Sequence, residues 1–189
     1  MNTVLKVILV GASGVVLSAC GGSSGGDSGG LQLVPGPSIP TSGSATYTGD
    51  LNFVLNEGGA GNVTYTGDLT VNANFSGSTV TGNATGFSDT DSESYTGTLT
   101  LQNGDIDRNL PSNLFPLFAD LDGTLTRVSD GTTYTSGAAI GADFYQSDGA
   151  TTPEEIRGRV SGTFQKDDGV TAPTTIAVEE TLSTFTASQ

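Results

Sequence analysis

The chain lacks histidine and tryptophan, and it has a single cysteine among its 189 residues. Without histidine there is no imidazole base for a catalytic triad, and zinc and haem sites lose their commonest ligand. Cys20 lies at the end of a leader, so thiol catalysis and iron–sulfur clusters are excluded from the rest of the chain. Carboxylate pairs such as Asp105 and Asp107 arise by chance among 20 acidic residues. We therefore expect no enzyme activity and no cofactor.

Positive charge is scarce as well. Six Lys and Arg residues oppose 20 Asp and Glu residues, which makes the formal net charge −14. Such a surface repels the phosphates of nucleic acids and the headgroups of anionic lipids. We expect no nucleic-acid partner, and we expect any membrane association to come from an acyl anchor.

The first 19 residues have the pattern of a lipoprotein signal peptide. Lys6 precedes the apolar stretch Val7 to Leu17, which is too short to span a bilayer as a permanent helix. Leu17-Ser18-Ala19-Cys20 then matches a lipobox, in which a thiol is the nucleophile for diacylglyceryl transfer. We predict cleavage before Cys20 and attachment of acyl chains such as palmitate at Cys20. Gly21 follows instead of Asp, which resembles lipoproteins sent on to the outer membrane.

A tether is predicted between this anchor and the folded domain. Gly21 to Gly30 contains only Gly, Ser and Asp, a composition typical of a flexible coil. Val34 to Pro40 adds three prolines, which are unsuited to a central strand. We predict a signal peptide at residues 1–19, the lipidated cysteine and tether at 20–42, and one β-barrel domain at 43–189.

Alternation of apolar and polar residues dominates the chain after Ser44. Apolar or small residues occupy every second position from Ala45 to Leu55 and again from Val63 to Phe75. A possible short strand around Asp105 would bring the number to eight, and the other five segments are 79–87, 95–102, 121–128, 137–145 and 158–165. We predict an all-β fold, a small antiparallel eight-stranded up-and-down barrel, in preference to a sandwich, because closure removes exposed strand edges.

The sequence Tyr-Thr-Gly recurs at Tyr47, Tyr65 and Tyr95. The Gly of each copy falls at a position that the alternation directs inward. An inward Gly suits the curvature of a small barrel or a facing aromatic ring, and room for a ligand is the alternative. The three tyrosines share strand faces with Leu and Phe, which favours core packing over ligation of ferric haem.

Two segments interrupt the strands, and the end of the chain is ambiguous. Leu110 to Leu121 is too apolar to be left in water, so we expect it to form a lid on one barrel end. Ala150 to Ile156 has Pro153 after a candidate N-cap, Thr152, which predicts one helical turn. Ile176 to Phe185 could add a final strand or stay mobile.

The stretch from Gly137 to Phe164, GAAIGADFYQSDGATTPEEIRGRVSGTF, resembles the C-terminal signature of the transferrin-binding-protein-like β-barrel family. The resemblance implies an eight-stranded lipoprotein barrel, a shape shared by transferrin-binding protein B and factor H-binding protein, and iron, haem or a protein as ligand. Gln146 stands where the family usually has Gly. The chain has room for one barrel and no handle domain, so transferrin binding is not implied. The matching positions are Ala139, Gly141, Phe144, Tyr145, Ala150, Glu154, Glu155, Gly158 and Gly162.

We therefore predict a non-enzymatic outer-membrane binding protein, displayed at the cell surface or on the periplasmic face. The candidate contacts for a protein ligand are Leu114, Phe115, Phe118, Tyr145 and Asp148. A weaker signal is the set Asp89, Asp91 and Glu93, three carboxylates of the kind that Ca²⁺ prefers, without the Gly and distant Glu of an EF-hand. The alternatives are a structural envelope lipoprotein without a ligand and a small-molecule carrier that uses the barrel interior.

Overall fold

The computed structural model describes residues 30–58, 61–111 and 114–189 of the chain. Within these ranges the fold is all-β, with a short 3₁₀ turn, η1 (Gly36–Ser38), before the barrel and no helix long and apolar enough to cross a membrane. The predicted lipidation site, Cys20, lies outside the described residues. The strands are β1 (Gln32–Leu33), β2 (Ser44–Asn56), β3 (Asn62–Asn74), β4 (Thr79–Asp89), β5 (Tyr95–Ile106), β6 (Leu117–Arg127), β7 (Thr133–Gln146), β8 (Glu155–Asp167), β9 (Thr174–Ala177) and β10 (Thr184–Ser188).

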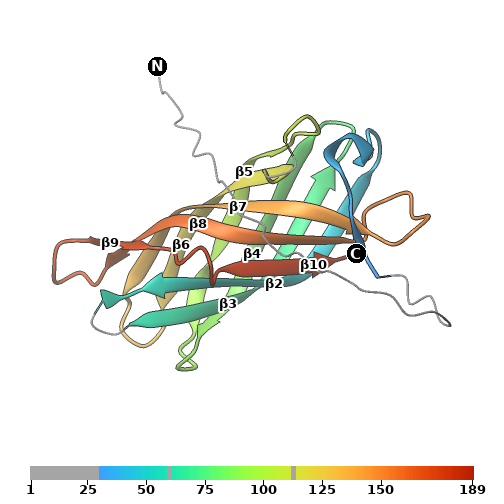
Figure 1. Ribbon diagram of the computed structural model, residues 1–189. Coiled ribbons are helices and arrows are strands. Elements are labelled where there is room, and N and C mark those ends of the chain that lie inside the picture. Colours follow the sequence, from blue (N-terminus) through green and yellow to red (C-terminus); the bar gives the residue numbers. More distant parts are fainter. Residues whose placement is uncertain (1–29, 59–60, 112–113) are drawn as a thin grey trace, which may run out of the picture.

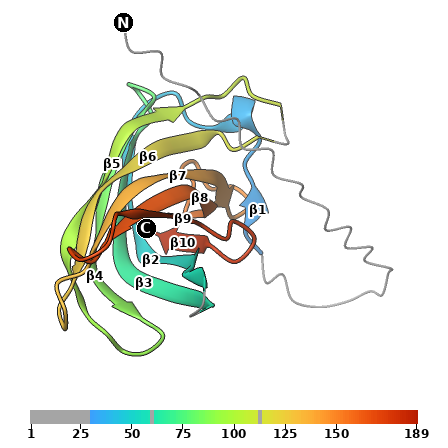
Figure 2. The same ribbon diagram turned by 90° about the vertical axis from the view of Figure 1, so that its left-hand side faces the viewer.

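The strands form a closed antiparallel barrel, as the alternation predicts (Figures 1 and 2). β2 to β8 pair with their neighbours in chain order, and β8 pairs with β7 on one side and β10 on the other. β10 also pairs with β2, which closes the sheet on itself. The predicted eight-stranded barrel is confirmed.

The eighth strand is not the one expected around Asp105. Asp105 belongs to β5, which continues past a bulge after Gln102 to Ile106. The closing strand comes from the ambiguous C-terminal segment and is split into β9 and β10, which pair with successive parts of β8. Between them lies Ser183, fully buried, whose hydroxyl accepts from Val54 N at 2.9 Å and donates to the Glu179 carbonyl at 2.9 Å. This hydroxyl satisfies a backbone group of β2 where the ladder is interrupted.

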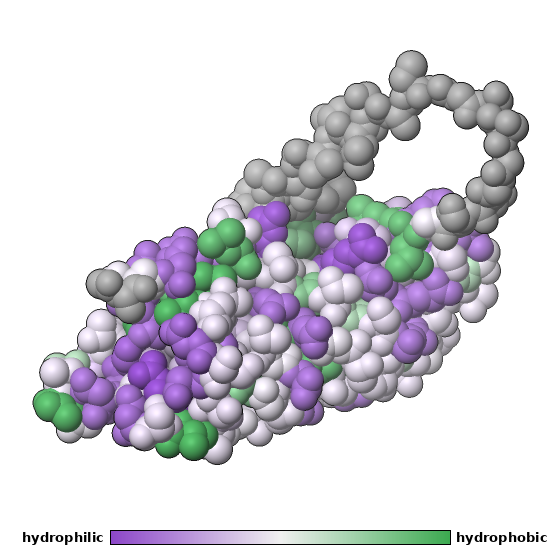
Figure 3. Space-filling view, turned by 90° about the horizontal axis from the view of Figure 1, so that it is seen from below, coloured by the Kyte–Doolittle hydropathy of each residue, from purple (hydrophilic) through white to green (hydrophobic). Residues whose placement is uncertain are grey.

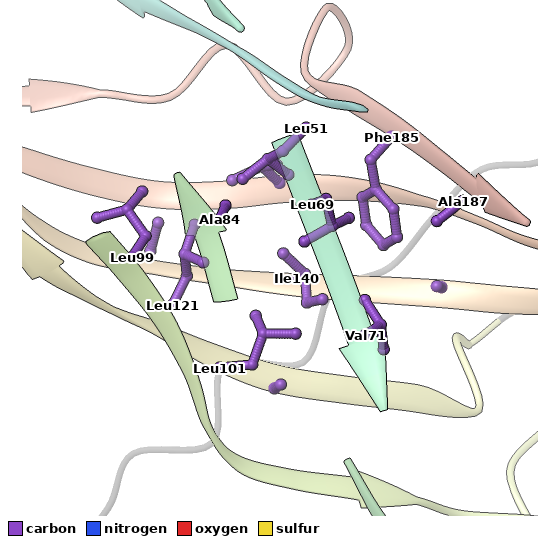
Figure 4. Close-up of a cluster of buried hydrophobic side chains, with 14 of the residues drawn as sticks. Leu51, Leu69, Val71, Ala84, Leu99, Leu101, Leu121, Ile140, Phe185 and Ala187 are labelled. Carbon is purple, nitrogen blue, oxygen red and sulfur yellow. The ribbon is translucent and has the colours of Figure 1, made fainter. Parts of the chain in front are cut away.

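The barrel interior is filled with side chains. In the middle of the barrel, leucines from facing strands point toward one another, as Leu51, Leu69, Leu99 and Leu121 do in Figure 4, and each of them is at most 1% exposed. Toward the end where β2 meets β3, Phe53 is stacked between Tyr65 and Phe164, with ring centroids 5.0 and 4.8 Å away. A fully buried side chain of this size contributes about 1.5–3 kcal/mol. The fold therefore rests on a core that occupies the barrel axis.

The glycines of the repeated Tyr-Thr-Gly motif allow atoms of neighbouring strands to approach the backbone closely. A Cβ on Gly67 would lie 2.6 Å from the ring of Phe87, which occupies the space that Gly67 leaves open. A Cβ on Gly49 would lie 2.0 Å from the carbonyl oxygen of Thr186 in β10. Gly97 has a φ of +118°, which residues with a side chain rarely adopt. Curvature and a facing ring, and not an opening for a ligand, account for these three positions.

Packing against the barrel begins earlier than the predicted domain boundary at residue 43. Val34 and Ile39 are buried, and Val34 N donates to the Phe144 carbonyl at 2.8 Å. Arg108 ties this segment down: its guanidinium donates to the carbonyls of Pro40 (Nε, 3.1 Å) and Phe75 (Nη2, 2.8 Å). Part of the predicted tether therefore closes one end of the barrel, an arrangement that local composition does not reveal.

Two local expectations differ from the structure. The lid expected at Leu110 to Leu121 does not include its second part, because Leu117 to Leu121 is the first part of β6 and lies in the barrel wall. Ala150 to Ile156 forms bends and the start of β8 instead of a helical turn. There the Glu154 carboxylate accepts from the backbone N of Ser147 at 3.1 Å, and the Pro153 carbonyl accepts from the hydroxyl of Tyr47 at 2.9 Å. These tertiary bonds hold the loop in a non-helical conformation.

Candidate functional site

Three buried tyrosines meet at one end of the barrel, which we call the tyrosine end. In an up-and-down barrel β3, β5 and β7 all run in the same direction, and each has a tyrosine near its start: Tyr65, Tyr95 and Tyr134. Their ring centroids are 5.2 to 5.8 Å apart, in tilted and edge-to-face arrangements. Tyr47 carries the same motif but belongs to β2, which runs the opposite way, so it lies at the other end. Strand direction therefore decides which of these tyrosines meet.

Glu57 lies at the centre of the polar groups above these rings. It follows directly after β2, and its side chain is only 5% exposed. Its Oε1 accepts hydrogen bonds from the hydroxyls of Tyr65 (2.5 Å) and Tyr134 (3.1 Å). Its Oε2 accepts from the ammonium of Lys166, near the end of β8, in an ion pair. The carboxylate is thus buried but bonded at both oxygens, which is the condition for a stable buried charge.

Arg127 and Asp89 extend this network around the barrel rim. The guanidinium of Arg127 lies 5.9 and 5.6 Å from the ring centroids of Tyr95 and Tyr134, within cation–π range. Its Nε donates to the Tyr95 hydroxyl at 3.3 Å, and that hydroxyl donates to Asp89 Oδ2 at 2.7 Å. A chain of charge-assisted bonds therefore joins the turns at this end.

The environment shifts the pKa of several of these groups. Burial by itself would raise the pKa of Glu57, but the hydrogen bonds from Lys166, Tyr65 and Tyr134 lower it below its ordinary value. Burial by itself would lower the pKa of Lys166, but its hydrogen bonds to Glu57 and Tyr134 raise that pKa above its ordinary value. Burial raises the pKa of all three tyrosines, in the case of Tyr95 to about 12. At neutral pH the ion pair is charged and the phenols are protonated.

A cleft of about 440 Å³ opens beside Glu57 and Lys166. It lies at the seam of the barrel, where Leu55 of β2 forms an isolated bridge with Val178, the residue that follows β9. Most of its lining side chains carry a hydroxyl, amide or charged group, about half of its lining surface is apolar, and its volume is within the range of small-ligand sites. The lining residues are Asn56, Glu57, Gly58, Lys166, Asp168, Thr171, Thr174, Thr175 and Ile176.

The contacts predicted for a protein ligand lie at the opposite end, which holds β1 (Figure 1). Leu114, Phe115 and Phe118 are half-buried, and Phe115 covers Gly141 on the outside of β7. Tyr145 is half-buried under the guanidinium of Arg157, 4.6 Å from its ring centroid. Asp148 is exposed in the loop between β7 and β8. The structure thus brings this set to one end of the molecule, away from the cleft.

The predicted calcium ligands do not form a cation site. Asp89 Oδ1 accepts from the backbone N of Asp91 (2.9 Å) and of Glu93 (3.0 Å), so this carboxylate closes its own turn. Asp91 is exposed. Across the described part of the chain, no three Asp, Glu, His or Cys side chains are grouped so as to hold a metal ion.

From the sequence alone, neither Glu57 nor Lys166 is assigned a role. The separate strand predicted around Asp105 reverses the direction of the strands after it, so the predicted strands 121–128 and 158–165 end at the opposite barrel end from the turn after Leu55. In the structure Asp105 belongs to β5, so β2, β6 and β8 end at the same barrel end, and Arg127 and Lys166 lie near Glu57.

A scan against protein-family models and searches of curated proteins and of solved structures gave no match. The resemblance to transferrin-binding-protein-like barrels therefore remains a prediction from the sequence.

Proposed function

We propose that this chain is a non-enzymatic, lipid-anchored binding protein of the outer membrane, with its ligand site at the tyrosine end. The observation that supports this most directly is the polar cleft between β2 and β9, beside a buried ion pair. Hydrogen bonds and an ion pair link Glu57 in the cleft wall to Lys166, Tyr65 and Tyr134, and a preorganised site loses less entropy when a ligand binds.

The filled interior argues against the carrier alternative. A carrier barrel keeps an apolar cavity along its axis. Here Phe53, Phe75, Phe144 and Phe164 are at most 1% exposed, and Ala84, a small inward residue, is packed among leucines (Figure 4). A ligand of this protein therefore binds at the rim or on the wall.

The cleft favours a hydrophilic ligand. Its threonines, amide and charged groups offer hydrogen bonds, whereas a haem macrocycle needs a large apolar wall. The raised pKa values of Tyr65 and Tyr95 keep their phenols protonated, which disfavours them as phenolate ligands of ferric iron. Among the ligand classes that the sequence suggests, a polar segment of a protein fits best.

Anchoring and display are tested together in whole cells. An epitope inserted between Gly169 and Val170, an exposed loop at the tyrosine end, should be labelled on intact cells. The mass of the mature N-terminal peptide should show acyl chains on Cys20. Acylation with labelling only after permeabilisation would support a periplasm-facing structural lipoprotein instead.

Binding is tested with defined probes on isotope-labelled protein. Haemin, ferric citrate and hydrophilic peptides would be titrated while backbone amide shifts are recorded. The proposal expects saturable shifts from a peptide at residues 56–58 and 166–176, weakened at least tenfold by Lys166→Met and unaffected by Arg159→Met. Saturable shifts confined to the β1 end, or binding of haemin alone, would contradict it.

A further inference from the structure

Apolar side chains collect on the outer wall at the β1 end. Phe118 lies between Leu117 and Ala119, both of which are buried, so alternation directs it outward. Phe115 covers Gly141, where a Cβ would lie 2.5 Å from the Phe115 ring, so the wall is shaped to receive this side chain. Leu33 pairs with Tyr145 across β1 and β7 and is 49% exposed. The four large side chains Leu33, Phe115, Phe118 and Tyr145 thus share one wall.

The rest of the outer surface is different in character. Outward positions carry Thr, Asn and Asp, and these bond to one another across strands, as Thr46 does to Asn72 (2.8 Å) and Thr66 to Asn52 (2.7 Å). In Figure 3 hydrophobic residues form small separate patches on a largely polar face. A group of aromatic residues at one place on such a surface indicates a site of contact with another molecule or with a membrane.

The wall is also where positive charge faces outward. Arg157 stacks on Tyr145 and pairs with Glu155, and Arg159 lies opposite Gly141. Within residues 30–58, 61–111 and 114–189, Arg159 forms no ion pair. Asp143, Glu155 and Asp105, whose Cα pairs with that of Phe118, are the acidic residues beside the two arginines. Two of the five Lys and Arg residues after Cys20 thus lie on this wall, which weakens its repulsion from an anionic bilayer relative to the rest of a chain with a net charge of −14.

The position of the wall relative to Cys20 suggests what covers it. Residues 21–31 are all that separate Cys20 from β1, and a Gly-rich chain of that length has a root-mean-square reach of roughly 17–20 Å. A 13-residue strand such as β2 is about 43 Å long. An anchor at Cys20 therefore holds the β1 end on average closer to the bilayer than the tyrosine end.

We propose that the membrane-facing wall, defined as Leu33, Phe115, Phe118, Tyr145, Arg157 and Arg159, lies against the bilayer that holds the acyl chains. The inference rests on the proposed lipidation of Cys20. Aromatic rings and Leu33 enter the interface, and the guanidinium of Arg159 binds lipid phosphates, for which its planar fork is suited. The contact orients the barrel so that the cleft points away from the membrane.

The chain has no tryptophan, so one introduced indole reports on its own position. The acylated protein would be reconstituted into vesicles of phosphatidylethanolamine and phosphatidylglycerol that contain brominated acyl chains. We expect Phe118→Trp to be quenched at least twofold more than the control Val170→Trp, which replaces a residue 89% exposed at the tyrosine end. Tyr145→Trp gives a second probe on the wall, in case Phe118→Trp alters the fold.

Flotation of the vesicles separates the two proposals. Protein that floats while both wall probes are quenched no more than Val170→Trp would overturn the membrane-facing wall and leave the lipid anchor standing. Protein without acyl mass that stays in solution would overturn the anchor, and the wall contact with it. Stronger quenching at both wall positions in floating protein supports the contact.

Discussion

The ion pair between Glu57 and Lys166 shows how a single buried carboxylate is held. The contribution of this ion pair to the stability of the protein depends on pH, and the direction follows from the pKa shifts of Glu57 and Lys166. The pKa of Glu57 lies below its ordinary 4.5 in the folded chain, so its contribution is present above about pH 4.5 and is lost as the pH falls through the folded value. The pKa of Lys166 lies above its ordinary 10.5, so its contribution is lost only at higher pH. The pair is fully effective between these limits.

Glu57→Gln should lower the free energy of unfolding at pH 7 by about 1–3 kcal/mol, because Lys166 loses its partner and the tyrosines lose a charged acceptor. Urea denaturation should show this difference shrinking below pH 4.5, where protonation of Glu57 removes the same charge from the wild type. Glu180→Gln, at an exposed position without an ion pair among the described residues, is the control and should change little. An effect of equal size at pH 7 and pH 3.5 would contradict the role of the charge.

Gly67→Ala should destabilise the barrel by about 1–3 kcal/mol, since the added methyl group overlaps the Phe87 ring. The matched control is Gly137→Ala in β7, where the nearest atom would be 3.5 Å from the new Cβ. The control should change stability by about 0.5 kcal/mol or less. The double variant Gly67→Ala with Phe87→Leu should recover part of the loss. Thermal denaturation of the wild type, the single variants Gly67→Ala and Phe87→Leu, and the double variant measures the coupling. Additive losses would show that the ring is not the cause.

At the scale of elements, Arg108 joins three segments that are distant in the chain. Its guanidinium also donates from Nη1 to the hydroxyl of Ser78 at 2.6 Å, in the turn between β3 and β4. The Arg108 side chain, from the loop between β5 and β6, thus connects the segment before β2 to the turn between β3 and β4. This explains why residues with the composition of a linker pack as part of the barrel end.

Arg108→Met should release the segment from residue 31 to residue 43 while the barrel stays folded. Hydrogen exchange should show faster exchange at the amides of Val34 and Ile39, which bond to the carbonyls of Phe144 and Gly36. Arg159→Met removes an arginine that makes no such bonds and should leave these amides protected. Unchanged protection in the Arg108 variant would mean that Val34 and Ile39 are held by burial alone.

At the scale of the whole molecule, the barrel has a filled interior and two ends that differ in their residues. One end holds β1, Arg108 and the loop with Glu154, and the other holds the tyrosines and the cleft (Figure 1). The fluorescent ligand retinol should therefore show no saturable binding of one molecule per chain. Leu121→Ala, in the centre of the core, should cost about 2–5 kcal/mol and open space for a small apolar molecule. Saturable retinol binding by the wild type would instead support a small-molecule carrier that uses the barrel interior.

The sequence by itself determined the fold class and the positions of seven of the eight barrel strands, because inward and outward residues alternate with a period of two in nearly every strand. It also predicted that the inward Gly of each Tyr-Thr-Gly copy serves strand curvature or a facing aromatic ring, and the ring is found at Gly67. Tertiary structure decided the rest. The split closing strand, the anchoring of residues 30–40 by Arg108 and the meeting of Glu57 with Lys166, 109 positions apart, depend on how the sheet curves and closes. The local alternation of residues does not predict that closure, since it specifies which face of the sheet a side chain takes and not which distant strand lies beside it.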